Sequence, residues 1–230
     1  VKLILDESDS YGVEMALQLV DAAGEGEVTL VSMAPNGERS GLATALAMGA
    51  ASATLISDPA LVGSDALTTA KLIASAIRGQ EPDLVIAGAE SSDGYTGVVP
   101  EMIAALLGLP SVTAAKAIEV DGDELKVKRQ TDGGYDSVVC PLPAVVSVTA
   151  GVVEPRYPSF KGIMAAKSKP VEQKTAADLG FGTDQVGWAG AGQEIVDVAN
   201  APKRQAGEII ADDGEGFAKI VAYLENMKLI

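Results

Sequence analysis

Residues 88–97 read Gly-Ala-Glu-Ser-Ser-Asp-Gly-Tyr-Thr-Gly, between an apolar run at 83–87 and a segment at 98–107 with apolar residues at helical spacing. This order predicts a strand, a glycine-rich loop and a helix. A loop that opens a helix presents free N–H groups and a positive dipole end to an anion. The stretch is therefore a candidate phosphate cradle, although an ordinary turn-forming loop explains the same residues.

Two familiar phosphate-binding motifs do not fit this loop. No Lys follows its glycines, as a Walker loop requires, and Gly88, Gly94 and Gly97 lack the spacing of a dinucleotide fingerprint.

The segments around the loop alternate between strand and helix patterns. Apolar spacing predicts a helix around 13–20 that ends at Gly24, and further helices at 38–48 and 65–78. Short apolar runs at 27–33 and 53–57 predict strands, as does the run at 83–87. Such alternation is typical of an α/β fold, a Rossmann-like parallel sheet with helices on both faces.

The pattern changes after Pro110. Runs at 111–120, 124–131 and 135–139 are separated by Asp-Gly and Asp-Gly-Gly turns, which predicts a short antiparallel meander. A last strand is expected at 144–149. We therefore expect one α/β domain at 1–150.

Residues 151–230 are expected to form a recognition loop and a C-terminal arm. The prolines at 155 and 158 disfavour a helix, so residues 157–162 are predicted to project as a loop with Phe160 at its tip. Residues 180–201 are rich in Gly and Ala and have no strong period. A final amphipathic helix is expected at about 215–227.

Composition narrows the function classes. The net charge of −15 gives no general attraction for nucleic acid or anionic lipid. The absence of His and the single Cys140 argue against a zinc site, an intrachain disulfide and a histidine general base. Without an apolar run of about 18 residues or a signal peptide, we expect a soluble protein of a reducing compartment.

Several motifs, in order along the chain, resemble the β subunit of electron transfer flavoproteins. They are Thr44-Ala-Leu-Ala-Met-Gly-Ala50, Val127-Lys-Arg-Gln-Thr-Asp-Gly-Gly134 with Leu142-Pro-Ala-Val-Val146, Glu154-Pro-Arg-Tyr-Pro158, Gly162-Ile-Met-Ala-Ala-Lys167 and Arg204-Gln-Ala-Gly207. The resemblance covers essentially the whole chain. Relatives open with an extra strand and loop, which this sequence does not contain.

The resemblance implies an electron carrier rather than an enzyme, with no catalytic residue. It implies a heterodimer with an α subunit that holds the redox FAD, and an AMP or a second FAD on this subunit. The implied partners are flavin dehydrogenases, such as acyl-CoA dehydrogenases, and a membrane quinone reductase. The implied location is the bacterial cytoplasm, or the mitochondrial matrix in a eukaryote.

The resemblance also assigns site residues. The nucleotide site falls on Asp6, Glu7, Ser8, Asp9, Met33, Gly88, Ala89, Glu90, Ser91, Ser92, Asp93, Gly94, Tyr95 and Thr96. In this assignment Gly88 and Gly94 admit the phosphate, and the hydroxyls of the loop donate to it. The partner-binding segment is Tyr157, Pro158, Ser159, Phe160, Lys161, Gly162, Ile163 and Met164, with Phe160 as the anchor in a pocket of the dehydrogenase.

Plainer roles stay open for some of these residues. Asp6 and Asp9 could cap the first helix, Met33 could pack in the core, and Phe160 could fold back onto its own subunit. A universal-stress-type nucleotide-binding protein is the competing function, but it has little use for eighty residues of arm. An ATP pyrophosphatase requires a Ser-Gly-Gly-x-Asp loop that this sequence lacks.

Overall fold

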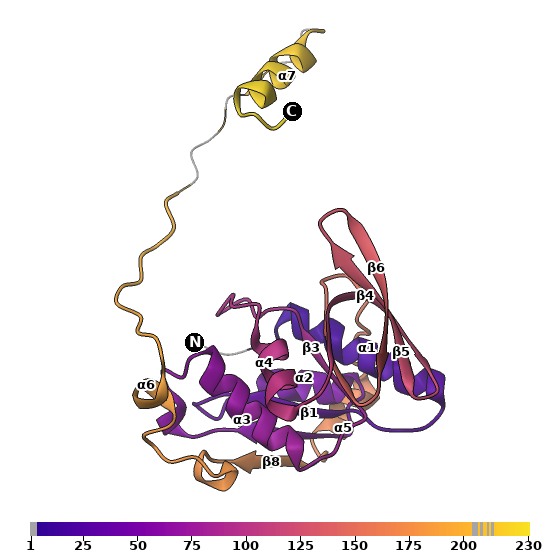
Figure 1. The fold of residues 1–230 in the computed structure, drawn as a ribbon, viewed down its shortest axis with the longest axis vertical. Helices are drawn as coiled ribbons and strands as arrows, with labels where there is room; N and C mark the ends of the chain where they lie inside the picture. Colours follow the sequence, from indigo (N-terminus) through magenta and orange to yellow (C-terminus); the bar gives the residue numbers. More distant parts are fainter. Residues whose placement is uncertain (1–3, 204–206, 208, 211, 213) are drawn as a thin grey trace. The chain divides into compact units, whose positions relative to one another are not determined.

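The structure is a computed structural model that describes residues 4–203, 207, 209, 210, 212 and 214–230. The chain divides into two compact units, Val1–Glu194 and Ile195–Ile230. The first unit holds both sheets and nearly all the helices, and the second holds the last helix (Figure 1).

The first half of the chain forms the expected alternation. Its elements are α1 (Glu7–Ala23), β1 (Thr29–Met33), α2 (Ser40–Met48), β2 (Ser52–Ile56), the 3₁₀ turn η1 (Pro59–Leu61), α3 (Ala66–Arg78), β3 (Leu84–Gly88) and α4 (Val99–Leu107). The Asp65 carboxylate caps α3 by accepting from the Thr68 N–H. Gly24 closes α1 in the left-handed conformation, with φ of 76°. Each expected helix and strand in this half is confirmed, with its ends moved by a few residues.

The strands form two sheets. One is parallel, in the order β1-β2-β8, where β8 is Val171–Lys174. The other has the order β3-β7-β4-β5-β6, formed with β4 (Ser111–Asp121), β5 (Glu124–Thr131), β6 (Gly134–Pro141) and β7 (Ala144–Val148). In it β7 runs parallel to β3 and β4, while β4, β5 and β6 form the predicted meander. The α/β fold class is confirmed.

Register places strand ends together. Met33 at the end of β1 pairs with Ile56 at the end of β2. Gly88 at the end of β3 pairs with Val148 at the end of β7. Apolar side chains between the sheets and helices form the core, with Leu55, Leu72 and Val146 fully buried. The glycine loop therefore leaves the carboxyl end of a core strand, where α/β proteins bind ligands.

The region after residue 150 is more ordered than its composition indicates. The prediction of a projecting loop at 157–162 is wrong, because α5 (Phe160–Ala166) begins there with Ser159 as its N-cap. The prolines lie before this helix, where they break no helical hydrogen bond. A Cβ on Gly162 would come closer than 3.0 Å to the Ala47 carbonyl oxygen, so this glycine permits close packing on α2 rather than a turn.

The first unit extends beyond the expected boundary at residue 150. The strand β8 continues the parallel sheet beside β2. After the 3₁₀ turn η2 (Ala177–Leu179), Val186 is buried in the core, and α6 (Gly187–Gly190) follows it. A Cβ on Gly187 would clash with the Ala60 carbonyl oxygen, so this segment depends on glycine to lie against η1. Long-range contacts of this kind are not visible in local sequence patterns.

The second unit contains α7 (Gly216–Asn226), which confirms the expected terminal helix. Phe217, Ile220 and Val221 are exposed on it. The Arg204-Gln-Ala-Gly207 motif lies outside the described residues, except for its last glycine. Nowhere in the described part of the chain is a helix both long enough and apolar enough to span a membrane.

Candidate functional site

The glycine loop is held against the first helix. The last residue of β3, Gly88, lies so close to α1 that a Cβ on it would stand 2.8 Å from the Ser8 Cβ. Any larger residue would push α1 away from β3. In the structure Gly88 therefore lets β3 pack closely on α1. The resemblance had assigned this glycine the role of admitting a phosphate.

Asp6 joins the helix to the loop. As the N-cap of α1, it accepts from the Ser8 N–H through Oδ1 at 2.8 Å. Through Oδ2 it accepts from the Ser92 N–H at 2.8 Å and from the Ser92 hydroxyl. Desolvation would raise the pKa of Asp6, but the hydrogen bonds from Ser92 and Ser8 outweigh it and lower the pKa. Two segments that the sequence assigned to one site are therefore in direct contact.

Asp9 lies one turn along the same helix. The residue is open to solvent but is crowded by protein atoms, and this desolvation is the first cause that raises its pKa to about 6. The negative charges of Asp6 and Asp93 raise it further, while a hydrogen bond from the Gly88 N–H opposes them. The negative charges of three carboxylates therefore act on one another here, although Asp6 and Asp93 already accept hydrogen bonds from the protein.

The far end of the loop offers donors. Tyr95 adopts φ of 48°, which is uncommon outside glycine, and Gly97 adopts φ of 61°. The helix α4 then begins at Val99, after the N-cap Val98, which makes no side-chain cap hydrogen bond. Pro100 in its first turn has no N–H, so the donors that this turn can offer a ligand are the N–H groups on either side of the proline. A Cβ on Gly94 would touch only the Ser91 hydroxyl, at 3.4 Å, so nothing crowds the loop there.

Met33 does not lie among these residues. It packs, half-buried, against the core cluster of Ile56, Leu61 and Leu72. This is the packing role that the sequence left open, although Met33 also ends a parallel strand. Cys140 is buried, and desolvation raises the pKa of its thiol, which suits a structural residue. Among the described residues, no group of His, Cys, Asp or Glu could hold a metal ion.

The segment that the resemblance assigned to partner binding is preceded by an ion pair that sequence reasoning missed. Glu14 on α1 is buried, and its carboxylate accepts from the Arg156 Nε at 2.7 Å, from an Arg156 Nη at 3.1 Å and from the Arg156 N–H at 3.1 Å. Arg156 also binds Asp21 at 3.0 Å. A charged residue in the apolar stripe of α1 was the only signal of this pair in the sequence.

The residues that follow Arg156 are exposed. Phe160 is 81% exposed and Tyr157 is 92% exposed, and Ile163 and Met164 on α5 are also exposed. In this structure Phe160 does not fold back onto its own unit. Large apolar side chains gathered on one surface are typical of a protein interaction site.

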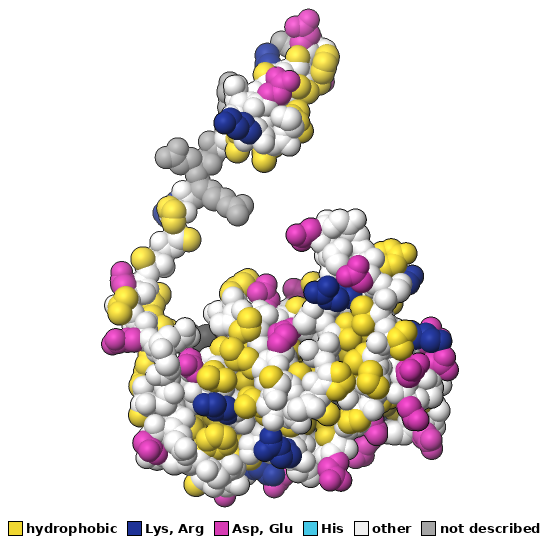
Figure 2. Space-filling model, viewed as in Figure 1, with side chains coloured by type: hydrophobic (Ala, Val, Ile, Leu, Met, Phe, Trp, Pro, Cys, Tyr) yellow, Lys and Arg dark blue, Asp and Glu magenta, His cyan; other side chains and the backbone are white. Residues whose placement is uncertain are grey.

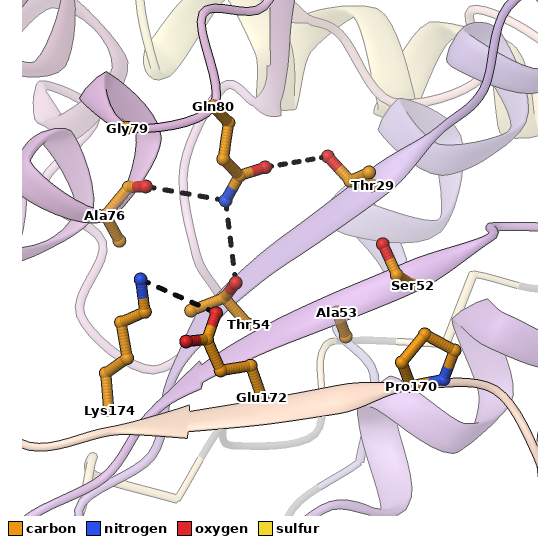
Figure 3. Close-up of a pocket in the computed structure, with 10 residues that line it drawn as sticks. All are labelled: Thr29, Ser52, Ala53, Thr54, Ala76, Gly79, Gln80, Pro170, Glu172 and Lys174. Atoms are coloured by element: carbon orange, nitrogen blue, oxygen red, sulfur yellow. Dashed lines mark hydrogen bonds and ion pairs between the residues drawn. The ribbon is translucent and has the colours of Figure 1, made fainter.

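A polar pocket lies away from the glycine loop. This pocket has a volume of about 350 Å³ and opens where β1 and β2 begin (Figure 3). Met33 lies at the opposite end of β1. Gln80 links Thr29 and Thr54 there, at 2.9 and 3.5 Å, and Lys174 pairs with Glu172 at 3.5 Å. These polar side chains bond to one another, while the Ser52 hydroxyl makes no hydrogen bond to the other residues drawn (Figure 3).

Acidic side chains outnumber basic ones in this chain. Carboxylates are spread over the visible face of the first unit, with fewer basic side chains between them (Figure 2). This distribution agrees with the net charge of −15. The field favours basic partner surfaces over nucleic acid.

Comparisons with known proteins agree with the motifs. Residues 1–179 match the family model described as the electron transfer flavoprotein domain. The chain is 42% identical to the electron transfer flavoprotein subunit beta of Mycobacterium leprae, over 99% of this chain and 87% of the relative. It is 35% identical to the protein of that name from Thermoanaerobacterium thermosaccharolyticum, over 100% of this chain and 89% of the relative. The chain therefore belongs to the electron transfer flavoprotein family, among its β subunits.

Proposed function

We propose that this chain pairs with an α subunit and carries electrons from flavin dehydrogenases, such as acyl-CoA dehydrogenases, to a membrane quinone reductase. The names of the relatives, each a subunit beta, support the pairing. The redox FAD is held mainly by the α subunit. The chain acts as an electron carrier, because the cofactor supplies the chemistry. The bacterial relatives favour the cytoplasm as its location.

We further propose that the loop at 88–97 and the start of α1 hold an adenine nucleotide, either AMP or a second FAD. The observation that carries this proposal is the Asp6–Ser92 contact, which unites two segments 86 residues apart at the end of β3. The uncapped start of α4 fits a phosphate, and the carboxylate of Asp9 fits a ribose hydroxyl or an adenine amine. AMP would be a structural ligand there, whereas a second FAD would add a redox centre.

The ligand content of the copurified αβ complex tests this assignment. The complex is denatured and the released nucleotides are separated and counted per heterodimer. We expect one FAD with one AMP, or two FAD. A complex that releases a single FAD and no other nucleotide would refute the nucleotide site.

A variant of the loop tests whether the nucleotide binds there. Gly94→Val fills the open side of the loop without a clash with backbone, since only the Ser91 hydroxyl lies near. We expect this complex to lose the second nucleotide and to melt at a lower temperature, because a ligand that binds only the native state stabilises it. Gly79→Val is the control at an exposed glycine with no neighbour within 4 Å. Full nucleotide content in Gly94→Val would move the site away from the loop.

We also propose that the segment Tyr157–Met164 docks the dehydrogenase. Phe160 is its most suitable anchor, because it is a large exposed aromatic beside two further exposed apolar residues of α5. The buried Arg156–Glu14 pair fixes the start of this segment on α1.

A further inference from the structure

The Ser92 donors are already engaged by an anion of the protein itself. The Ser92 N–H and hydroxyl both point at one oxygen, Oδ2 of Asp6. The other oxygen, Oδ1, remains on the Ser8 N–H and caps α1. Desolvation of Asp6 is outweighed by these hydrogen bonds, which keep its pKa lowered and its carboxylate ionised at neutral pH.

A backbone N–H and a hydroxyl that converge on one oxygen form the arrangement that a phosphate oxygen would use. We propose that Asp6 is an internal competitor for the nucleotide phosphate, which must displace the Asp6 carboxylate from Ser92 to use these donors. This inference rests on the nucleotide site proposed above. It assigns Asp6 a role opposite to that of a ligand-holding residue.

The competition weakens binding of a phosphate-bearing nucleotide but not of an uncharged nucleoside, so Asp6 lowers the preference of the site for the nucleotide. An uncharged nucleoside offers nothing that replaces a carboxylate on two donors, whereas a phosphate dianion offers more charge and more acceptor oxygens. Asp9 and Asp93 add negative charge beside Asp6, so they also oppose the phosphate. Neither of them accepts a hydrogen bond from Ser92, which leaves Asp6 as the direct rival among the described residues.

The test is Asp6→Ser in the αβ complex. A serine at the N-cap can still accept from the Ser8 N–H, but it is too short to hold Ser92 as well. After exchange of the bound nucleotide, equilibrium dialysis against radiolabelled AMP measures the dissociation constant. Since a hydrogen bond to a charged group is strong, we expect Asp6→Ser to bind AMP about 10-fold more tightly than the wild type. Adenosine affinity should not change.

Two further variants separate competition from other effects. Asp65→Ser alters the N-cap of α3 and should leave AMP binding unchanged. In a Ser92→Ala background, Asp6→Ser should no longer improve AMP binding, because the contested donor is gone. An equal gain in both backgrounds would show simple charge repulsion and overturn the proposal. Weaker AMP binding by Asp6→Ser would also overturn the proposal, because Asp6 would then keep the loop in the conformation that binds the nucleotide. If neither the wild type nor the variant binds AMP or FAD at this loop, the nucleotide site itself is refuted.

Discussion

Replacement of Arg156 by Ala should destabilise the protein strongly. The substitution removes two charge-assisted hydrogen bonds, at 2.7 and 3.1 Å, from a Glu14 side chain that is only 4% exposed. Glu14 keeps the hydrogen bonds from Gln18 and from the backbone N–H of residue 156. It nevertheless becomes a buried charge with no counterion.

The magnitude follows from burial. Breaking a buried pair by removing one partner costs about 3–5 kcal/mol. The Arg156 side chain is 37% exposed, so water can reach part of the vacated space. We therefore expect a loss of about 2–3 kcal/mol in the free energy of unfolding at pH 7. Urea denaturation followed by far-ultraviolet circular dichroism measures it.

The pH dependence has a defined sign. Desolvation acts to raise the pKa of Glu14, but hydrogen bonds from Arg156 and Gln18 outweigh it, so the folded-state pKa is lowered. The pair therefore stabilises the protein above the unfolded-state pKa, and this stability is lost as the pH falls through the folded-state pKa. In Arg156→Ala, Glu14 is expected to take up a proton more readily, so the penalty should shrink towards pH 4.

A surface pair provides the matched control. Arg129 lies 3.5 Å from Asp136, and both side chains are largely exposed. Arg129→Ala should cost about 0.5 kcal/mol or less. If Arg156→Ala costs no more than this control, or if its penalty is the same at pH 7 and pH 4, the buried-pair reasoning is wrong.

Three further predictions concern single positions. Gly162→Ala should separate α5 from α2 and cost about 1–3 kcal/mol, whereas Gly79→Ala, which meets no neighbour within 4 Å, should be neutral or slightly stabilising in the same melting experiment. Because the pKa of Asp9 is raised to about 6 from 3.8, the free energy of unfolding of the wild type should fall as the pH rises between these values. Asp9→Asn should remove that fall and, after allowance for solvent exposure, raise the free energy of unfolding by about 1 kcal/mol at pH 7.5. An unchanged pH profile would contradict it. Phe160→Ala should leave the melting temperature unchanged, since the side chain is 81% exposed, and weaken electron transfer from the dehydrogenase by about 2 kcal/mol in apparent affinity; a lower melting temperature with normal transfer would place Phe160 in the core.

Elements that depend on local interactions could be predicted from the amino-acid sequence. Apolar spacing along α1 and α3, the Asp65 cap and the closing Gly24 are each set within a few residues, so they could be read without coordinates. The Asp-Gly turns likewise located the meander. The family motifs also lie in short stretches, which is why the resemblance could be recognised before the structure.

Contacts between distant segments became visible only in the folded chain. β8 is a short, mostly polar strand that becomes visible only by its pairing with β2, and α5 depends on a glycine that faces Ala47. Glu14 meets Arg156 across 142 residues, and Asp6 meets Ser92 across 86. No local pattern encodes such pairs, because their energy comes from burial and charge that exist only once the chain has folded.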